Sequence, residues 1–298
     1  MRLIRFTTSV LLLVASCQLS VRAGQNNVTG NVLANTLLIR TPQGQGTGFT
    51  IDVDGRQYLI TAKHMVDGMG EAGTIELAKL DNAHDVLFVP YQMKIFTCAG
   101  SIDIAVLIPP VRLTLGDTMQ PTEWTMGQDA YFVGFPFGMH SQGKTNPPGI
   151  THPIGFVKQG LVSGVQYQHD GDADLILLDG YNVFGFSGGP VTYWEPPNRS
   201  YVIGVISGFK PAYGDVMVPK EIRNQDIRSE DFGTGRIIEL SDHPGHVYRL
   251  EEKEVNGRKT NEMVMMNTGI VRSYGIQAAI NLIKLHPIGP VVSGVRPN

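Results

Sequence analysis

The apolar residues of this chain come in short runs separated by Gly, Asp or Pro, and this spacing constrains the fold more than any other feature. Each run is long enough for a β-strand but too short for a helix, and the separators favour turns. In the first part of the chain the runs are 37–39, 49–51, 58–61, 86–89, 93–96 and 104–107. The pattern predicts an all-β sandwich or barrel.

A second series of runs follows Pro109-Pro110 after a less regular stretch. Its members are 130–133, 160–163, 175–178, 190–193 and 201–206. We therefore expect two β units of similar size, one over residues 24–115 and one over residues 116–298. The only convincing helical spacing lies over residues 276–283, and His286-Pro287 ends it.

Charge argues against nucleic acid as a partner. The chain has 24 Lys and Arg against 27 Asp and Glu, a formal net charge of -3, so it has no basic excess to neutralise phosphates. Charged residues concentrate in 220–262, which we interpret as a solvated insertion. It is either a loop that overhangs a cleft or an exposed segment without function.

The N-terminal residues have the layout of an export signal. Arg2 and Arg5 precede an apolar run over 9–15, and small residues follow. Cleavage after residue 23 would give a signal over 1–23 and a soluble mature protein. Alternatively, the segment ending at Cys17 resembles a lipoprotein box, with a signal over 1–16 and a lipid on Cys17 as the membrane anchor. The apolar run is too short to span a bilayer stably.

With Cys17 in the leader, the mature chain keeps only Cys98, so it has no intrachain disulfide. Cys98 lies in the segment 94–99, which reads as a strand. We therefore expect a buried, unreactive thiol rather than a nucleophile.

The most informative motif is Gly185-Phe186-Ser187-Gly188-Gly189-Pro190. A Ser flanked by glycines exposes its hydroxyl and leaves backbone N–H groups free to face a developing oxyanion. The pattern also fits the nucleophile elbow of α/β-hydrolases or an ordinary glycine turn. Gly188-Gly189-Pro190 starts a helix poorly, and residues 191–194 read as a strand, so strand-turn-strand is favoured over the elbow.

Two further residues give this Ser a context. His64 ends an apolar strand, where an imidazole can face a cleft. Asp103 lies in a segment, 101–107, that reads as an otherwise apolar strand. An ionised carboxylate there needs a partner, and a His N–H would supply one. The order His64, Asp103, Ser187 is that of the chymotrypsin-type catalytic triad.

At these residues the chain resembles the trypsin-like serine peptidases, most closely the bacterial, HtrA-like branch without disulfides. The matching segments are 46–49, 59–64, 103–107, 134–136, 160–163 and 185–190. The resemblance implies two antiparallel β-barrels with the active site between them and a C-terminal helix. It implies a serine endopeptidase without cofactor or metal, acting on a protein or peptide substrate.

The resemblance also implies roles for residues. Ser187 would be the nucleophile, His64 the general base and Asp103 its orienting acid, and the reaction would pass through an acyl-enzyme. The backbone N–H groups of Gly185 and Ser187 would form the oxyanion hole.

The specificity pocket would lie between Tyr181 and the strand containing Ser207, Gly208 and Phe209. No Asp sits plainly at its base, so we expect an uncharged residue before the scissile bond.

Three departures from the family accompany this resemblance. Lys63 stands where relatives have a small residue. Phe186 replaces the Asp with which digestive relatives capture a freed N-terminus, so we expect no activation of that kind. We also expect no PDZ domain, because the chain ends soon after the late helix.

Three other interpretations fit parts of the sequence. Residues 170–174 resemble a calcium loop, but Leu175 and Tyr181 occupy positions that need Gly and Glu, so a hairpin turn is favoured. An esterase using Ser187 would take its acid and base from later in the chain, for example Asp242 and His246. An inactive, peptide-binding relative would keep the fold without the activity.

Overall fold

The computed structural model describes most of the chain between residues 28 and 292. The described ranges are 28–141, 150–167, 174–196, 199–215, 217–227, 237–239, 246–252, 254–255, 258–259 and 263–292. The predicted leader, with both of its cleavage sites, lies outside them. The described residues divide into a main unit, up to Gly208 and again from Val271, and a second unit over Phe209–Ile270.

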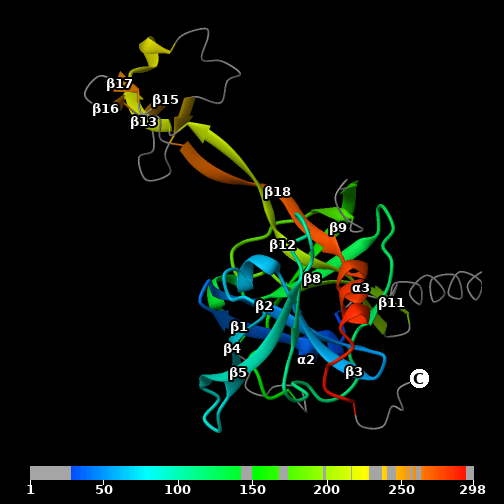
Figure 1. The fold of residues 1–298 in the computed structure, drawn as a ribbon. Helices are drawn as coiled ribbons and strands as arrows, with labels where there is room; N and C mark the ends of the chain where they lie inside the picture. The colour runs from blue at the N-terminus through cyan, green and yellow to red at the C-terminus, as the bar shows by residue number, and fades with distance from the viewer. Residues whose placement is uncertain are drawn as a thin grey trace, which may run out of the picture. The chain divides into compact units, whose positions relative to one another are not determined.

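The first half of the main unit is a closed antiparallel barrel of six strands in the order β1-β2-β3-β6-β5-β4 (Figure 1). The strands are β1 (Thr36–Thr41), β2 (Gly44–Val53), β3 (Arg56–Thr61), β4 (Ala72–Leu80), β5 (Val86–Thr97) and β6 (Ala105–Ile108). Its interior holds fully buried aliphatic side chains such as Leu37, Leu59 and Leu77.

Two details of this barrel differ from the sequence interpretation. The runs 86–89 and 93–96 belong to one strand, β5, which continues through Pro90. Around Pro90, β5 pairs with β4 alone and reaches β6 only from Lys94 onward, so a residue without an N–H is tolerated there. Strand β4, with Glu76 and Lys79 among its apolar residues, has no counterpart among the predicted runs.

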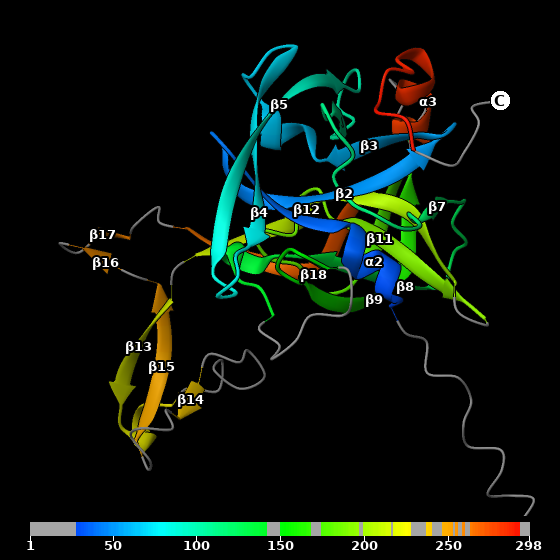
Figure 2. The same ribbon diagram turned by 90° about the horizontal axis from the view of Figure 1, so that it is seen from below.

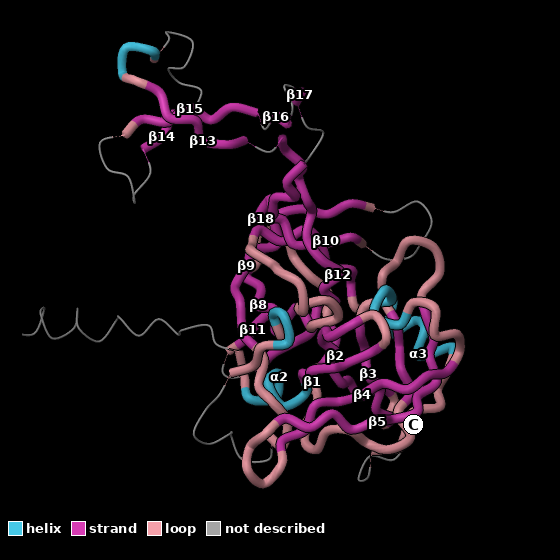
Figure 3. The backbone as a smooth tube through the Cα atoms, turned by 90° about the vertical axis from the view of Figure 1, so that its left-hand side faces the viewer, coloured by secondary structure: helices cyan, strands magenta, loops and turns pink. Residues whose placement is uncertain are grey.

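The second half of the main unit is also a ring of antiparallel strands, in the order β11-β8-β9-β10-β18-β12, which the β11–β12 pairing closes (Figure 3). The strands are β8 (Asp129–Gly134), β9 (Phe156–Gln166), β10 (Leu175–Asp179), β11 (Pro190–Glu195), β12 (Arg199–Asp215) and β18 (Met263–Gly275). A short strand, β7 (Gln120–Pro121), pairs parallel to β12. The expected architecture of two antiparallel barrels is confirmed.

Helices are few among the described residues. The helix α3 (Gln277–Leu285) confirms the predicted late helix and lies beside the first barrel, where the Ala278 carbonyl faces the thiol of Cys98 (Figure 2). A short helix, α2 (Gly30–Asn35), precedes β1, and 3-10 turns η1 (Lys63–Val66) and η2 (Pro136–Gly138) follow β3 and β8. No helix of the described residues is long and apolar enough to cross a membrane.

One hydrophobic cluster joins the two barrels. It contains Phe49 and Ile60 of the first barrel together with Val133 and Val205 of the second, and all four side chains are buried. The side chain of Ile276, next to α3, belongs to the same cluster. Burial of apolar surface therefore holds the barrels in one body and fixes the residues at their junction.

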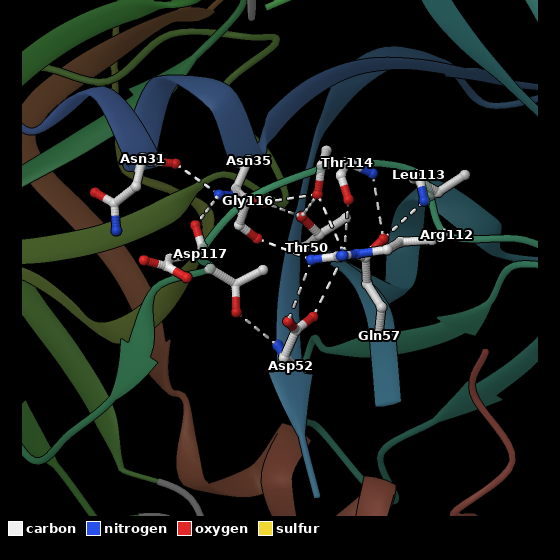
Figure 4. A network of polar contacts seen from close by, with 11 residues as sticks. Asn31, Asn35, Thr50, Asp52, Gln57, Arg112, Leu113, Thr114, Gly116 and Asp117 are labelled. Atoms are coloured by element: carbon white, nitrogen blue, oxygen red, sulfur yellow. Dashed lines mark hydrogen bonds and ion pairs between the residues drawn. The ribbon is translucent and has the colours of Figure 1, made fainter. Parts of the chain in front are cut away.

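The chain segment between the barrels is fastened by a buried polar network (Figure 4). Gln57 of β3 lies at its centre: Oε1 accepts the N–H groups of Leu113 and Thr114 at 2.7 and 3.2 Å, and Nε2 donates to the Thr114 carbonyl at 3.2 Å. Asn35 at the end of α2 accepts from the Thr50 and Thr114 hydroxyls, both at 2.7 Å. The network satisfies backbone groups that no strand pairs.

The second unit contains the distal parts of β12 and β18 and two small sheets. A three-stranded sheet has the order β13-β15-β14 and a two-stranded sheet pairs β16 with β17. The strands are β13 (Met217–Ile222), β14 (Ile237–Glu239), β15 (Val247–Glu252), β16 (Glu254–Val255) and β17 (Arg258–Lys259), with η3 at Asn224–Asp226. The charged segment 220–262 is part of this unit.

Candidate active site

His64 follows the end of β3, on the 3-10 turn η1, and its side chain is half exposed. Two of its groups face the same carboxylate. The backbone N–H donates to Asp103 Oδ1 at 2.9 Å, and ring Nδ1 lies 2.8 Å from Oδ2. With Nδ1 protonated, the imidazole is held at a fixed orientation and its Nε2 is left as the basic nitrogen.

Asp103 lies in a loop rather than within a strand. Sequence analysis placed it in a strand over 101–107, but β6 begins only at Ala105, and Asp103 belongs to the segment 98–104 that connects β5 with β6. In a strand, the side-chain alternation would decide whether the carboxylate faces the barrel interior. In the loop, the carboxylate can face His64 instead. A third donor, the Ser207 hydroxyl, reaches Oδ2 at 2.6 Å.

These contacts decide the charge of Asp103. Burial alone would raise the pKa of its carboxyl, but the hydrogen bonds from His64 and Ser207 and the attraction of His64 outweigh burial and hold the pKa below its usual range. Asp103 is therefore a carboxylate at neutral pH. It can stabilise a positive charge that develops on the imidazole.

Ser187 lies on the turn that connects β10 with β11. The chain continues as strand β11 from Pro190, so the predicted strand-turn-strand context is confirmed, and the α/β-hydrolase alternative is wrong in its fold. The Ser187 hydroxyl donates to the Ser207 carbonyl oxygen at 3.5 Å. Ser207 thus contacts both Asp103 and Ser187.

The backbone around Ser187 leaves two N–H groups available. Within the described part of the chain, neither the Gly185 N–H nor the Ser187 N–H donates to a protein acceptor. The Phe184 carbonyl accepts from the Phe137 N–H at 2.9 Å. Because C=O and N–H of one peptide unit point in opposite directions, the Gly185 N–H points away from Phe137.

Gly185 itself has to be glycine. Its φ is +100°, and a Cβ would collide with the Phe135 carbonyl oxygen. Its own carbonyl accepts from the Thr47 hydroxyl at 2.7 Å. The peptides on both sides of Gly185 are therefore fixed by bonds to other segments, and the orientation of its N–H is set before any ligand arrives.

Phe137, which holds this peptide, was not predicted from the sequence. It has φ +52° and ψ 27°, a left-handed conformation that is uncommon for a non-glycine residue, and its side chain is exposed. Strained backbone of this kind clusters at functional sites. The exposed ring of Phe184 lies beside it, with ring centroids 6.4 Å apart.

Phe186 fixes the turn through its buried side chain. Its side chain is fully buried, with its ring packed edge-on against Phe132 at 5.4 Å. A Cβ on Gly134 would lie 2.6 Å from this ring, so Gly134 is required for the packing. Phe186 therefore holds this turn through apolar contact and offers no charge for an ion pair.

The residues predicted to bind substrate take different positions. Tyr181 is 59% exposed, and its carbonyl oxygen accepts from Lys158 Nζ at 2.8 Å. Lys158, whose ammonium also lies 5.1 Å from the Tyr181 ring, was not singled out in the sequence. A Cβ at Gly208 would meet nothing within 4 Å, and Phe209 is the first residue of the second unit.

The calcium-loop and esterase hypotheses involve residues outside this site. Residues 170–173 of the rejected calcium loop lie outside the described residues, while β9 and β10 on either side pair as an antiparallel hairpin. Among the residues that the structure describes, no group of three His, Cys, Asp or Glu side chains is placed to hold a metal ion. His246 contacts Glu221 within the second unit, and Asp242 is not described.

Cys98 is buried and free, as expected from the sequence. Burial raises the pKa of its thiol to about 11, against a smaller opposing effect of the Lys63 ammonium. At neutral pH it is a thiol rather than a thiolate, and so is a poor nucleophile.

Comparison with known proteins gives a match to a family model. The sequence matches the trypsin-like peptidase domain over residues 46–193, about half of the chain. This segment runs from β2 to β11 and contains His64, Asp103 and Ser187. No curated protein matches the sequence.

Several solved structures are similar at low sequence identity. The protease Rv3671c of M. tuberculosis H37Rv, in an inactive form, is 17% identical, with a TM-score of 0.41, over 62% of this chain and 87% of that chain. The MamO protease domain of Magnetospirillum magneticum is 17% identical, with a TM-score of 0.40, over 62% and 88%. The HtrA-type protease AlgW with a decapeptide is 14% identical, with a TM-score of 0.47, over 89% and 69%.

Proposed function

Because the chain carries a trypsin-like peptidase domain, we propose that it is an exported serine endopeptidase that cleaves peptide bonds through Ser187, His64 and Asp103. The observation that carries the proposal is the double hydrogen bond from His64 to the Asp103 carboxylate, at 2.9 and 2.8 Å. The turn that carries the partly buried Ser187 lies close to the start of η1, since a Cβ on Gly188 would lie 2.8 Å from the Ala62 backbone N. An imidazole oriented by a carboxylate and placed beside a Ser is the arrangement that activates a hydroxyl.

In the proposed reaction, Ser187 Oγ attacks the scissile carbonyl carbon and His64 Nε2 takes the hydroxyl proton. The imidazolium that forms is stabilised by Asp103, and it then protonates the leaving amine. Water hydrolyses the acyl-enzyme by the same steps, with His64 again as base and acid.

The N–H groups of Gly185 and Ser187, which donate to no acceptor in the described ranges, support an oxyanion hole in this reaction. Each donor of this type contributes about 3 kcal/mol to transition-state stabilisation. The contribution depends on orientation that exists before the reaction. The bonds of the Phe184 and Gly185 carbonyls to Phe137 and Thr47 supply that orientation here.

We also propose an uncharged residue before the scissile bond. Tyr181, in the position expected at the pocket, carries no acidic side chain, and the nearby cation of Lys158 is engaged with the Tyr181 carbonyl and ring. A basic substrate side chain finds no carboxylate in this group of residues. Peptides with Leu, Val or Ala at the cleaved position are therefore the first substrates to test.

Export is proposed from the N-terminal sequence. The charged and apolar segments of residues 1–23 favour secretion or a periplasmic location, and the alternative use of Cys17 would add a lipid anchor. N-terminal sequencing of the mature protein distinguishes a chain that starts at Gly24 from one that starts at a lipidated Cys17.

Activity is tested by labelling the purified protein with a fluorophosphonate, which reacts with activated serine hydroxyls. The wild type is compared with Ser187→Ala and His64→Ala, and with two matched controls. Ser163→Ala removes an exposed β-strand hydroxyl, and His84→Asn removes an exposed imidazole at a left-handed position. Each variant is checked for folding by circular dichroism.

We expect labelling of the wild type and of both controls, and none of Ser187→Ala or His64→Ala. Labelling that persists in His64→Ala would show that His64 is not the base. A folded wild type that is neither labelled nor active on peptides would instead favour an inactive, peptide-binding relative.

A further inference from the structure

The loop that presents Asp103 to His64 is attached from outside at several points. It spans residues 98–104, between the end of β5 and the start of β6, where strand pairing does not supply partners for its carbonyl groups. Its base is closed by the Cys98 N–H, which donates to the Ile104 carbonyl at 3.0 Å. The position of Asp103 therefore depends on what binds the remaining carbonyls.

Two of those carbonyls accept hydrogen bonds from one ammonium group. Lys63 Nζ donates to the Cys98 carbonyl at 3.0 Å and to the Gly100 carbonyl at 3.1 Å. The next carbonyl, that of Ser101, accepts from the Tyr274 hydroxyl of β18 at 2.7 Å. An ammonium has three donors and no acceptor, so a single Lys can serve two carbonyls at once.

The contacts of Lys63 and His64 form a closed arrangement. The two residues are neighbours in η1. Lys63 binds the beginning of the loop, and His64 binds its end through two bonds to Asp103. Gly100, whose carbonyl is the second acceptor of Lys63, has φ +60° and turns the chain toward Asp103. A loop attached at both ends to adjacent residues cannot rotate its carboxylate away from the imidazole without breaking a charge-assisted bond.

We propose that Lys63 is a positioning residue that holds the Asp103 loop so that the carboxylate stays bonded to His64. This inference rests on the proposed function, because the bond matters for activity only if His64 acts as a base. It also gives a role to Lys63, the charged residue that stands where the resembling family has a small one. An alanine at this position could not reach the carbonyls of Cys98 and Gly100.

The test compares variants at position 63. Lys63→Met keeps most of the side-chain length and removes every donor, while Lys63→Arg keeps donors. Lys63→Gln retains one donor group and serves if the Met variant does not fold. Lys94→Met is the matched control, because Lys94 is exposed on β5 and its side chain has no hydrogen bond or ion pair in the part of the chain that the structure describes.

Two readouts are needed. The first is kcat and KM for a peptide substrate, together with the rate of fluorophosphonate labelling. The second is the low-field proton resonance of the His64 Nδ1–H, assigned by its absence in Asp103→Asn. The resonance reports the His64–Asp103 bond in the resting protein, whether or not the protein is active.

We expect Lys63→Met to lower kcat on the order of 10- to 100-fold with little change in KM, as small misplacements of catalytic groups do. The low-field resonance should broaden or disappear in Lys63→Met. Lys63→Arg should recover most of the kcat and most of the resonance intensity. Lys94→Met should behave as the wild type.

The inference is overturned if Lys63→Met retains the wild-type resonance and kcat, if Lys94→Met loses as much, or if the wild type itself shows no low-field resonance. A wild type that shows the resonance but neither labels nor cleaves refutes the proposed function. The comparison of resonances among the position 63 variants still decides the positioning role in that case.

Discussion

Replacing Gln57 by Leu should strongly destabilise the protein. The buried side chain satisfies the N–H groups of Leu113 and Thr114 and the Thr114 carbonyl, as Figure 4 shows. Leucine fills a similar volume but leaves these three groups without partners. At about 1–2 kcal/mol for each unsatisfied buried group, we expect a loss of about 3–6 kcal/mol in the free energy of unfolding. This is a large part of the typical stability of a domain.

Urea unfolding followed by tryptophan fluorescence and circular dichroism measures this loss. Gln92→Leu is the control, because Gln92 is exposed on β5 and accepts only the Thr74 hydroxyl there. Its change should stay within about 0.5 kcal/mol. A loss below about 1 kcal/mol in Gln57→Leu, or equal losses in the two variants, would refute the reasoning.

In the related variant Gln57→Glu, we expect the free energy of unfolding to fall as the pH rises. The new carboxyl would be buried near the Asp52 carboxylate and the Thr114 carbonyl oxygen, so its pKa in the folded protein would rise above its unfolded value of about 4.3. Protonated, it can donate as the amide does. Stability close to that of the wild type should therefore be present below the unfolded pKa and be lost as pH rises through the folded pKa.

Three further predictions concern the site and its surroundings. Asp103→Asn should lower kcat by about 10⁴-fold while the protein remains folded, because the His64 ring loses its correct tautomer; activity within tenfold of the wild type would contradict this. Phe137→Pro removes the N–H that fixes the Phe184 carbonyl and, because proline holds φ at about −65°, also loses the left-handed backbone, so it should slow fluorophosphonate labelling about 100-fold. Phe137→Gly keeps the donor and the left-handed backbone and should label normally; equal rates in the two variants would contradict the proposed orientation of the Gly185 N–H. Burial lowers the pKa of His152 from 6.5 to about 4, so its contribution to stability is fully present above pH 6.5 and is lost as pH falls toward 4. This loss should reach about 3 kcal/mol, and parallel stability curves for wild type and His152→Gln between pH 6.5 and 4 would count against it.

The strands and the late helix were predictable because their signals are local. Short apolar runs bounded by turn residues correspond to strands of both barrels, and the spacing over 276–283 corresponds to α3. Local patterns could not show that two runs belong to one strand, or that a strand such as β4 exists without an apolar run. Pro90 separates two runs in the sequence but lies inside β5, since the tolerance for proline depends on which neighbours the strand has.

The site shows the same limit more clearly. Ser207 was predicted at the specificity pocket, and its hydroxyl also binds Asp103, a residue 104 positions earlier in the chain, which no local pattern could show. Phe137 has no sequence signature, because a left-handed aromatic residue differs from the usual preference for Gly or Asn. Lys63 was recognisable as unusual, but its partners became visible only when the loop over 98–104 was in place.

The state of Cys98 has a practical consequence for spectroscopy. A chain that starts at Gly24 has this one cysteine, and its thiol is buried and protonated at neutral pH. A cysteine introduced at an exposed position such as Leu115, which is 81% exposed, would then be the only thiol to react with a maleimide fluorophore or a spin label. Motions of the segment between the barrels can therefore be followed with single-site probes without removing a native residue first.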